Sequence, residues 1–359
     1  MNDVKYKALV ATLTKEILTG KFVPLGAFPS ERALAKRFSA SRQTIRRVIG
    51  ELNRRGLIYS KQGQGTFLTR SGKNLRETVG LILTGERRTE IGREIREEMT
   101  RLSKRMGLSL LFGDASALNA RVGAKTAVQL AKKFAAANVS GVVLQPVEFL
   151  PDAEKCNARI VSFFAKAGIP VVLIDCDVAP EPYRSPYDVV GIDNFQAGRQ
   201  LAVHLQEKGV RDVVFLAQRH FPATIAERIR GVRSAFAENW SDESLVVLQT
   251  LGAESVRRAF ARRRRPEAVV CQNDVAALNA LAAFRALRWS VPHDVLVAGF
   301  DDVAYAPLAE PSLTSIRQPC RHIAGRAFDL LLARIGKSTM PSESVFLAPG
   351  LVVRQSTQR

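Results

Sequence analysis

The sequence predicts two folds in one chain, a small α+β module followed by a larger α/β region. Short amphipathic helices and two short strands fit between residues 5 and 69. A polar segment at residues 70–77 then separates this module from the rest of the chain. From residue 78 onward, runs of Val, Leu and Ile alternate with helical stretches, which is typical of parallel strands covered on both faces. We therefore expect domains at residues 1–69 and 78–359, joined by a linker.

Chain length and net charge indicate the number of domains and the kind of partner. With 359 residues and 46% hydrophobic content, the chain is long enough for two or three domains and at least one large core. The net charge of +19 is unevenly spread, because residues 1–78 hold 16 Lys and Arg against 5 Asp and Glu, a net +11. Such clustering indicates a module that binds a polyanion.

The sequence lacks the marks of a membrane or secreted protein. No apolar run reaches the roughly 18 residues that cross a bilayer, and the N-terminal segment has no apolar signal core. We therefore expect a cytoplasmic protein without a membrane partner. Four widely spaced cysteines without a CxxC pair disfavour a disulfide framework or a zinc site, so neither a metal nor another cofactor is expected.

Three helices are predicted in the N-terminal module. The first runs from Lys5 to Thr19, where apolar residues recur at helical spacing. The second begins at Ser30 and the third after Ser41, because each serine can accept a backbone N–H as an N-cap. The third helix has a core-facing side and an opposite, polar side. The core-facing residues are Ile45, Val48, Ile49 and Leu52, and the polar ones are Arg42, Gln43, Arg46 and Arg47.

The polar side of the third helix predicts contact with nucleic acid, because its long donors can reach phosphates and base edges in a major groove. Two strands, Leu57 to Ser60 and Thr66 to Leu68, come after it and are joined by a glycine-containing tip that can lie along a backbone or minor groove. The alternative for each arginine is a solvated helix face. For Arg54 and Arg55, past the last core turn, both interpretations stay open.

These segments resemble the GntR-type winged helix-turn-helix over about residues 5–69. The shared motifs are Pro29-Ser30-Glu31-Arg32, Ser41-Arg42-Gln43-Thr44-Ile45-Arg46, Gly56-Leu57-Ile58 and Gly63-Gln64-Gly65-Thr66-Phe67. In that family the motif arginine, the start of the recognition helix and the wing tip contact double-stranded operator DNA. The resemblance therefore implies DNA contacts from Arg32, Ser41, Arg42, Gln43, Thr44, Arg46, Lys61, Gln62 and Gly63.

Eight strands are predicted in the large region, where an α/β sheet would bind ligands at the carboxyl ends of its strands. They are Thr78 to Leu83, Leu108 to Phe112, Gly141 to Leu144, Pro170 to Ile174, Val189 to Ile192, Val213 to Ala217, Ala268 to Cys271 and Val295 to Phe300.

Motifs of a second family are spread over the same region. They are Ile169-Pro170-Val171-Val172-Leu173-Ile174-Asp175, Asp193-Asn194, Arg228-Ile229-Arg230-Gly231, Asn273-Asp274, Gly299-Phe300-Asp301-Asp302 and Leu313-Thr314-Ser315-Ile316-Arg317-Gln318. They resemble the effector domain of LacI/GalR-type regulators, which is similar to periplasmic sugar-binding proteins. The resemblance implies a two-lobed α/β periplasmic-binding-protein-like domain, a ligand cleft and a homodimer. A GntR-type reader joined to such a domain is the combination found in AraR-type arabinose-responsive repressors.

The same resemblance implies that the cleft binds a small carbohydrate-like effector. It assigns Arg228 as the pocket arginine, Asp274 as the carboxylate that binds hydroxyls, and Gln318 as a contributor from the crossover, with Asn194 and Asn273 as further candidates. A guanidinium and a carboxylate can each make two hydrogen bonds to neighbouring hydroxyls. From the residues alone, Asp274 could instead cap a helix and Arg228 could be paired on the surface.

Some positions depart from the pattern of this second family. Residues 84–91 lack the aromatic pair that often stacks on a pyranose ring, and Cys176 stands where a sugar-binding arginine is frequent, so a plain hexose is not specifically predicted. Cys176, Cys271 and Cys320 adjoin the pocket motifs, so a redox or metal sensor is an alternative to simple packing. The run Arg262-Arg263-Arg264-Arg265 offers either a second DNA contact or a surface that offsets a helix dipole.

We expect a dimeric, ligand-responsive transcriptional repressor that binds a palindromic operator. Two other classes stay open: a protein whose DNA binding is independent of any ligand, and a DNA-binding module fused to an enzyme-like domain. The four histidines show no HExxH spacing, and no GxxxxGK[ST] phosphate loop occurs, so we do not expect an enzyme.

Overall fold

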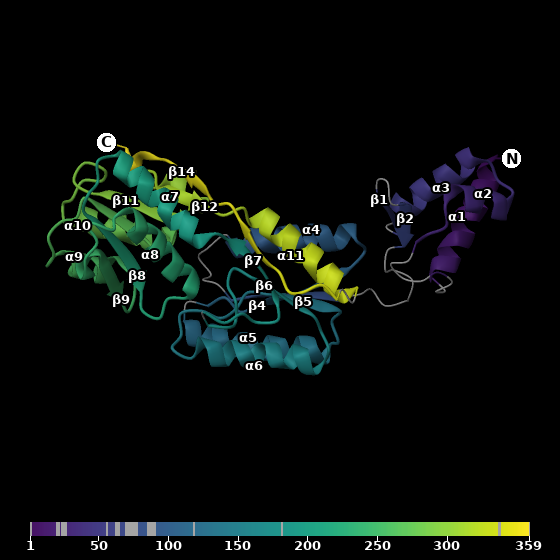
Figure 1. Ribbon diagram of the computed structural model, residues 1–359, viewed down its shortest axis with the longest axis horizontal. Helices are drawn as coiled ribbons and strands as arrows, with labels where there is room; N and C mark the ends of the chain where they lie inside the picture. Colours follow the sequence, from purple (N-terminus) through teal and green to yellow (C-terminus); the bar gives the residue numbers. More distant parts are fainter. Residues whose placement is uncertain are drawn as a thin grey trace. The chain divides into compact units, whose positions relative to one another are not determined.

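Figure 1 shows the protein as a computed structural model. It describes residues 2–18, 22, 27–54, 57–61, 65–68, 78–84, 91–117, 119–180, 182–336 and 339–358. The predicted linker, residues 70–77, lies outside the described residues. The larger of two compact units comprises Gly80–Met99 and Phe112–Arg359.

Three helices and a hairpin form the N-terminal module, as the sequence predicted. They are α1 (Asn2–Leu18), α2 (Glu31–Phe38), α3 (Arg42–Arg54), β1 (Ile58–Lys61) and β2 (Gly65–Leu68). Each helix contributes apolar side chains to a shared core, in which Leu13, Leu34 and Ile45 are fully buried. The apolar side predicted for the third helix faces this core, because Ile45, Val48, Ile49 and Leu52 are all buried.

Local hydrogen bonds define the ends of these elements. The Ser30 Oγ accepts from the Ala33 backbone N–H at 3.2 Å, which starts α2, and Ser39 adopts left-handed geometry (φ 45°) where α2 ends. In the antiparallel hairpin Lys61 lies opposite Gly65, whose φ of +107° favours glycine. The predicted hairpin is therefore present, with the first strand shifted by one residue and the second beginning one residue earlier.

Two six-stranded sheets form the large region, in the orders β13-β7-β6-β5-β3-β4 and β14-β12-β11-β10-β8-β9. The first contains β3 (Thr78–Leu83), β4 (Ser109–Asp114), β5 (Gly141–Leu144), β6 (Val171–Ile174), β7 (Asp188–Ile192) and β13 (Ser344–Leu347). The second contains β8 (Val213–Gln218), β9 (Leu245–Leu248), β10 (Ala268–Cys271), β11 (Leu296–Asp301), β12 (Thr314–Arg317) and β14 (Gly350–Val352). Strands β8 to β12 pair in parallel, whereas β14 pairs with β12 antiparallel.

Helices connect the strands and cover the sheets (Figure 1). They are α4 (Ile91–Arg105), α5 (Ala120–Ala136), α6 (Ala153–Lys166), α7 (Asn194–Glu207), α8 (Ala223–Ala235), α9 (Ala253–Phe260), α10 (Asp274–Ala286) and α11 (Cys320–Ile335). The chain passes from the first sheet to the second after β7 and returns after β12 through α11, which packs on β5, β6 and β7. It crosses once more between β13 and β14. These crossings confirm the predicted two-lobed α/β architecture.

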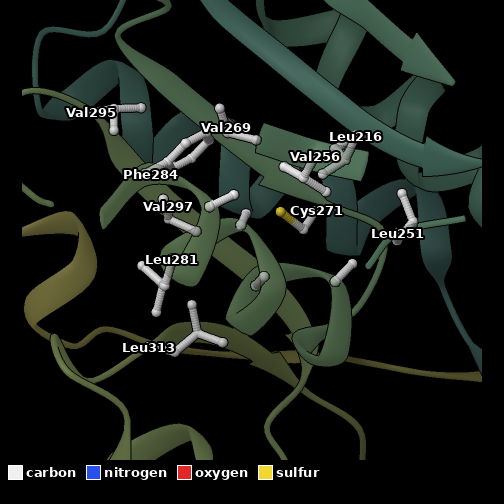
Figure 2. Packing of buried hydrophobic residues seen from close by; sticks show 14 of the residues in the cluster. Leu216, Leu251, Val256, Val269, Cys271, Leu281, Phe284, Val295, Val297 and Leu313 are labelled. Atoms are coloured by element: carbon white, nitrogen blue, oxygen red, sulfur yellow. The ribbon is translucent and has the colours of Figure 1, made fainter. Parts of the chain in front are cut away.

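A close-packed apolar core holds the second lobe together (Figure 2). Leu216, Val269 and Val297 come from three adjacent strands, and Phe284 of α10 packs against them. Cys271 is fully buried in this cluster, and burial raises the pKa of its thiol, so it acts as a small apolar side chain. The structure therefore supports the packing interpretation of this cysteine.

Candidate functional site

The start of α3 presents two exposed polar side chains, Arg42 and Gln43. Ser41 caps the helix, because its Oγ accepts from the Thr44 backbone N–H at 3.2 Å. The Thr44 hydroxyl lies 2.9 Å from the same oxygen, and Thr44 itself is buried. The cap thus positions Arg42 and Gln43 in the first turn, while Thr44 stabilises the cap.

Arg46 lies one turn further along α3 and is oriented by a carboxylate from α2. Its Nε and Nη2 donate to the two carboxyl oxygens of Glu31 at 3.3 and 3.2 Å. This pairing raises the pKa of the Arg46 guanidinium. The Arg46 side chain is 77% exposed, and Arg32 on α2 is exposed as well. Because solvent screens such a pair, it orients the guanidinium more than it stabilises the fold.

The structure describes some of the remaining basic residues and hairpin residues near the predicted DNA surface. The Arg47 guanidinium lies 4.7 Å from the centre of an aromatic ring of α1, and Arg54 pairs at 2.7 Å with a glutamate of its own helix. Gln62 and Gly63 lie outside the described residues, and only the backbone of Lys61 is described.

A cavity of about 320 Å³ lies between the two lobes of the large region. Polar residues from both sheets reach it at the carboxyl ends of their strands, the place where α/β sheets bind ligands. They are Thr84 after β3, Gln145 and Glu148 after β5, Asp175 after β6, Gln218 at the end of β8, Asn273 after β10, Asp301 at the end of β11 and Gln318 after β12. Asp114 at the end of β4 and helices α4, α5 and α8 also contribute to the wall.

Arg228, on α8, is a buried cation of this cavity. Its Nε donates to Asn194 Oδ1 at 2.8 Å, and its Nη1 donates to the Gln272 carbonyl oxygen at 2.7 Å. The guanidinium also lies 4.6 Å from the centre of the Phe300 ring. Arg228 is only 4% exposed, so it faces the cavity rather than the outer surface. Asn194 supports this arginine, although it does not itself line the cavity.

Asp301, Gln318 and Asn273 complete the cavity wall on the side of the second lobe. Gln318 donates through Nε2 to Asp301 Oδ1 at 2.8 Å, which links the end of β11 to the crossover. Asn273 caps α10, because its Oδ1 accepts from the Ala276 backbone N–H at 2.9 Å. The free N–H groups and the positive dipole end of α10 therefore lie beside the cavity.

The structure places Asp274 outside the cavity lining, unlike the role assigned to it from the sequence. Asp274 is fully buried, and its two carboxyl oxygens accept from Ser315 Oγ at 2.6 Å and from the Val303 backbone N–H at 3.0 Å. It is not the side-chain cap of α10 either, because Asn273 has that role. The carboxylate of the second lobe that faces the cavity is Asp301.

Three further carboxyl groups of the cavity, those of Asp114, Glu148 and Asp175, were not assigned from the sequence. Asp175 directly follows β6, and Glu148 lies four residues beyond β5. Burial and the nearby Asp175 raise the pKa of Glu148 to about 8. Burial also raises the pKa of Asp175. Asp175 belongs to a motif of the second family and directly follows a predicted strand, so its position at a carboxyl end was a usable signal; Glu148 has no such motif.

The structure also bears on the alternative roles of the cysteines and of the arginine run. Among the described residues, no group of three or more His, Cys, Asp or Glu is placed to hold a metal ion. Burial raises the pKa of the Cys176 thiol and raises that of Cys320 to about 12, which keeps both protonated. Arg265 pairs with Asp294 at 3.0 Å, which favours the surface interpretation of the arginine run.

Two family models match separate parts of the chain. Residues 5–68 match the bacterial regulatory proteins of the gntR family, and residues 202–357 match a periplasmic binding protein-like domain. The arabinose metabolism transcriptional repressor of Halalkalibacterium halodurans is 28% identical over 99% of this chain and 97% of its own length. The repressor of the same name from Geobacillus stearothermophilus is 26% identical over 99% and 98%.

A solved structure shows the same fold. The transcriptional regulator CelR in complex with cellobiose superposes with a TM-score of 0.66 at 23% identity, covering 92% of this chain and all of the other. None of the described helices of the present chain is both long and apolar enough to cross a membrane. The chain is a transcriptional regulator that carries a GntR-type winged helix-turn-helix ahead of a two-lobed periplasmic-binding-protein-like domain.

Proposed function

We propose that this regulator is a repressor whose operator affinity responds to a small polyhydroxylated effector. The observation that carries the proposal is the presence, in one chain, of an exposed cationic helix start and a cavity lined by hydrogen-bonding side chains from two lobes. The names of the two relatives that align over the whole chain support a role in the control of carbohydrate metabolism.

We place the DNA contacts on α3, α2 and the hairpin. Arg42, Gln43 and Arg46 would read base edges in the major groove, and the free N–H groups behind Ser41 would receive a phosphate. Arg32 and the hairpin tip, Lys61 to Gly63, would contact the backbone. A homodimer would present two such helices to half-sites of a palindromic operator, one helical turn or a multiple of it apart.

We place the effector among Arg228, Asp301, Asn273 and Gln318, with the first lobe closing over it. Because both lobes contribute to the cavity, a bound ligand favours the conformation in which they contact it together. In a dimer that change would alter the spacing of the two DNA modules. A coupling free energy of about 1 to 3 kcal/mol would change operator affinity about 5- to 150-fold.

The DNA part is tested by letting the purified protein select sequences from a random pool and then measuring affinity for the selected operator. If Arg42 contacts a guanine, Arg42→Ala weakens operator binding by about 1 to 3 kcal/mol. Arg321→Ala, at an exposed arginine of α11, serves as the charge-matched control and leaves affinity unchanged. Wild-type operator affinity and selectivity in Arg42→Ala would contradict the placement of α3.

The sensing part is tested by thermal-shift screening of the protein against sugars, sugar acids and polyols. We expect at least one carbohydrate to raise the unfolding temperature, because binding to the native state stabilises it. If none of the compounds that bind changes operator affinity, DNA binding is independent of ligand and the repressor is not a sensor.

A further inference from the structure

The loop that carries Glu148 is held in place on both sides. The buried Asn157 side chain makes two hydrogen bonds to Val147, accepting from its backbone N–H at 2.8 Å and donating to its carbonyl oxygen at 2.9 Å. Thr84 donates through its hydroxyl to the Pro146 carbonyl oxygen at 2.6 Å. The position of Glu148 against the cavity is therefore fixed by the fold before any ligand arrives.

One carboxyl oxygen of Glu148 has no protein partner. Its Oε1 is buried and receives no hydrogen bond from a described residue. The groups that face the Glu148 carboxyl are Asp175 and the Cys176 thiol after β6, Arg228 on α8 and Asp301 at the end of β11. A buried carboxyl oxygen at a cavity wall is unfavourable unless a water molecule or a ligand group donates to it.

The charges around this oxygen do not balance. Among the described groups that act on the Glu148 carboxyl, the carboxyl groups of Asp175 and Asp301 stand against one guanidinium, that of Arg228. Arg228 already donates through Nε and Nη1 to protein oxygens. Cys176 cannot compensate, because a thiol is neutral when protonated and adds negative charge when it ionises.

Two arginines of α4 also line the cavity, and each contacts another side chain. Arg93 pairs with Glu97 at 3.1 Å, and the Arg96 guanidinium lies 5.3 Å from the centre of the Phe112 ring. Neither is among the charges that act on Glu148. Among the described groups that act on Glu148, negative charge therefore exceeds positive charge whenever all three carboxyl groups are ionised.

We propose that the effector is a polyhydroxylated amine, such as an amino sugar, whose ammonium group binds at Glu148, Asp175 and Asp301 while its hydroxyls contact the second lobe. This inference rests on the proposed effector-sensing function and names the class of ligand. An ammonium group carries three N–H donors and one positive charge, so it satisfies the unpaired oxygen and offsets the excess negative charge together. A neutral hydroxyl supplies one donor and no charge.

The protonation of Glu148 is consistent with this assignment. Because the pKa of Glu148 is raised to about 8, its carboxyl is mostly neutral near pH 7 in the protein alone. A cation beside it favours the ionised form, so binding of an amine releases a proton from Glu148. A neutral sugar has no such effect.

The test uses matched pairs of probes that differ by one amino group: Tris against pentaerythritol, D-glucosamine against D-glucose, and D-galactosamine against D-galactose. Dissociation constants are obtained from thermal shifts of the full chain near pH 7 at constant ionic strength. We expect at least one amine to bind about tenfold or more tightly than its neutral partner, as a charge-assisted hydrogen bond allows.

Glu148→Gln keeps the shape of the side chain and removes its charge, so the preference for that amine falls to about twofold or less. Glu154→Gln, at an exposed position of α6, is the control and keeps the wild-type preference. The proposal is overturned if no amine binds more tightly than its neutral partner, or if Glu148→Gln retains the full preference. Failure of the proposed function is a separate result, namely ligand binding without any change in operator affinity.

Discussion

Two buried aspartates near the cavity have different partners and therefore different consequences when replaced. Asp274 accepts hydrogen bonds from Ser315 and the Val303 backbone inside the second lobe. Asp301 lines the cavity and accepts from Gln318. The first is a structural carboxyl group, whereas the second is one that we propose contacts the effector.

We predict that Asp274→Ala lowers the free energy of unfolding by about 1 to 3 kcal/mol, because it leaves two buried donors without an acceptor. Its affinity for an effector stays close to that of the wild type. Asp301→Asn has the opposite profile, with weakened effector binding and a smaller loss of stability. Urea unfolding and ligand titration of both variants check this, and weaker ligand binding by Asp274→Ala with unchanged stability would contradict the placement.

The raised pKa of Glu148 predicts that the stability of the protein depends on pH. Its pKa of about 8 in the folded protein exceeds the usual 4.5, so between these values the folded state binds more protons than the unfolded state. The contribution of Glu148 to stability therefore falls as pH rises from about 4.5 to about 8. We expect Glu148→Gln to gain thermal stability relative to wild type over this range, as followed by calorimetry. A constant difference between the two proteins across the range would show that Glu148 has an ordinary pKa.

Among single residues, the sequence motifs correctly indicated an arginine and two amide side chains of the cavity, but not its carboxyl groups. Arg228, Asn273 and Gln318 line the cavity as their motifs implied. Asp274 does not, because one residue along α10 is enough to turn a side chain from the cavity into the core. Glu148 could not be found from a single sequence, since its role depends on a loop positioned by Asn157 from another element.

At the scale of elements, the crossing of α7 and α8 positions Arg228. A Cβ atom added at Gly198 would lie 2.1 Å from the Arg228 carbonyl oxygen, and one added at Gly231 would lie 2.1 Å from the Phe195 carbonyl oxygen. Both helices therefore approach at glycine positions where no side chain fits. This close approach brings Asn194, at the start of α7, within hydrogen-bonding distance of Arg228.

We predict that Gly198→Ala forces the helices apart and lowers the free energy of unfolding by about 1 to 3 kcal/mol or more. It also weakens effector binding, because Arg228 moves away from Asn194. Gly325→Ala is the control: no atom lies within 4 Å of its added Cβ, and alanine is favoured inside a helix by about 0.5 to 1 kcal/mol. Equal stability of the two variants, measured by urea unfolding, would contradict the close crossing.

Strands differed in how clearly their sequences indicated them. The eight runs of Val, Leu and Ile all form strands, with bounds that differ by at most two residues, because buried parallel strands are continuously apolar. The edge strands β9, β13 and β14 were not predicted, and they are short, with three or four residues each. β12 was missed as well, because its buried Thr314 and Ser315 are polar and depend on hydrogen bonds from distant residues.

For the whole molecule, the sequence predicted that a winged helix-turn-helix precedes a two-lobed α/β domain, because each fold has its own local motifs. The net charge of +11 on residues 1–78 also indicated the DNA-binding domain, because these residues include the predicted recognition helix α3. The identity of the effector was not predictable, because the cavity joins side chains from segments as far apart as Thr84 and Gln318.

The central claim is that occupancy of the cavity changes DNA binding. The direct measurement is the affinity of the full chain for its selected operator, by fluorescence anisotropy, with and without a saturating carbohydrate identified by thermal shift. We predict a change of about 5-fold or more in the wild type, which corresponds to about 1 kcal/mol of coupling, and no change in Asp301→Asn at the same ligand concentration. Identical operator affinity of the wild-type protein with and without the bound ligand would contradict the account.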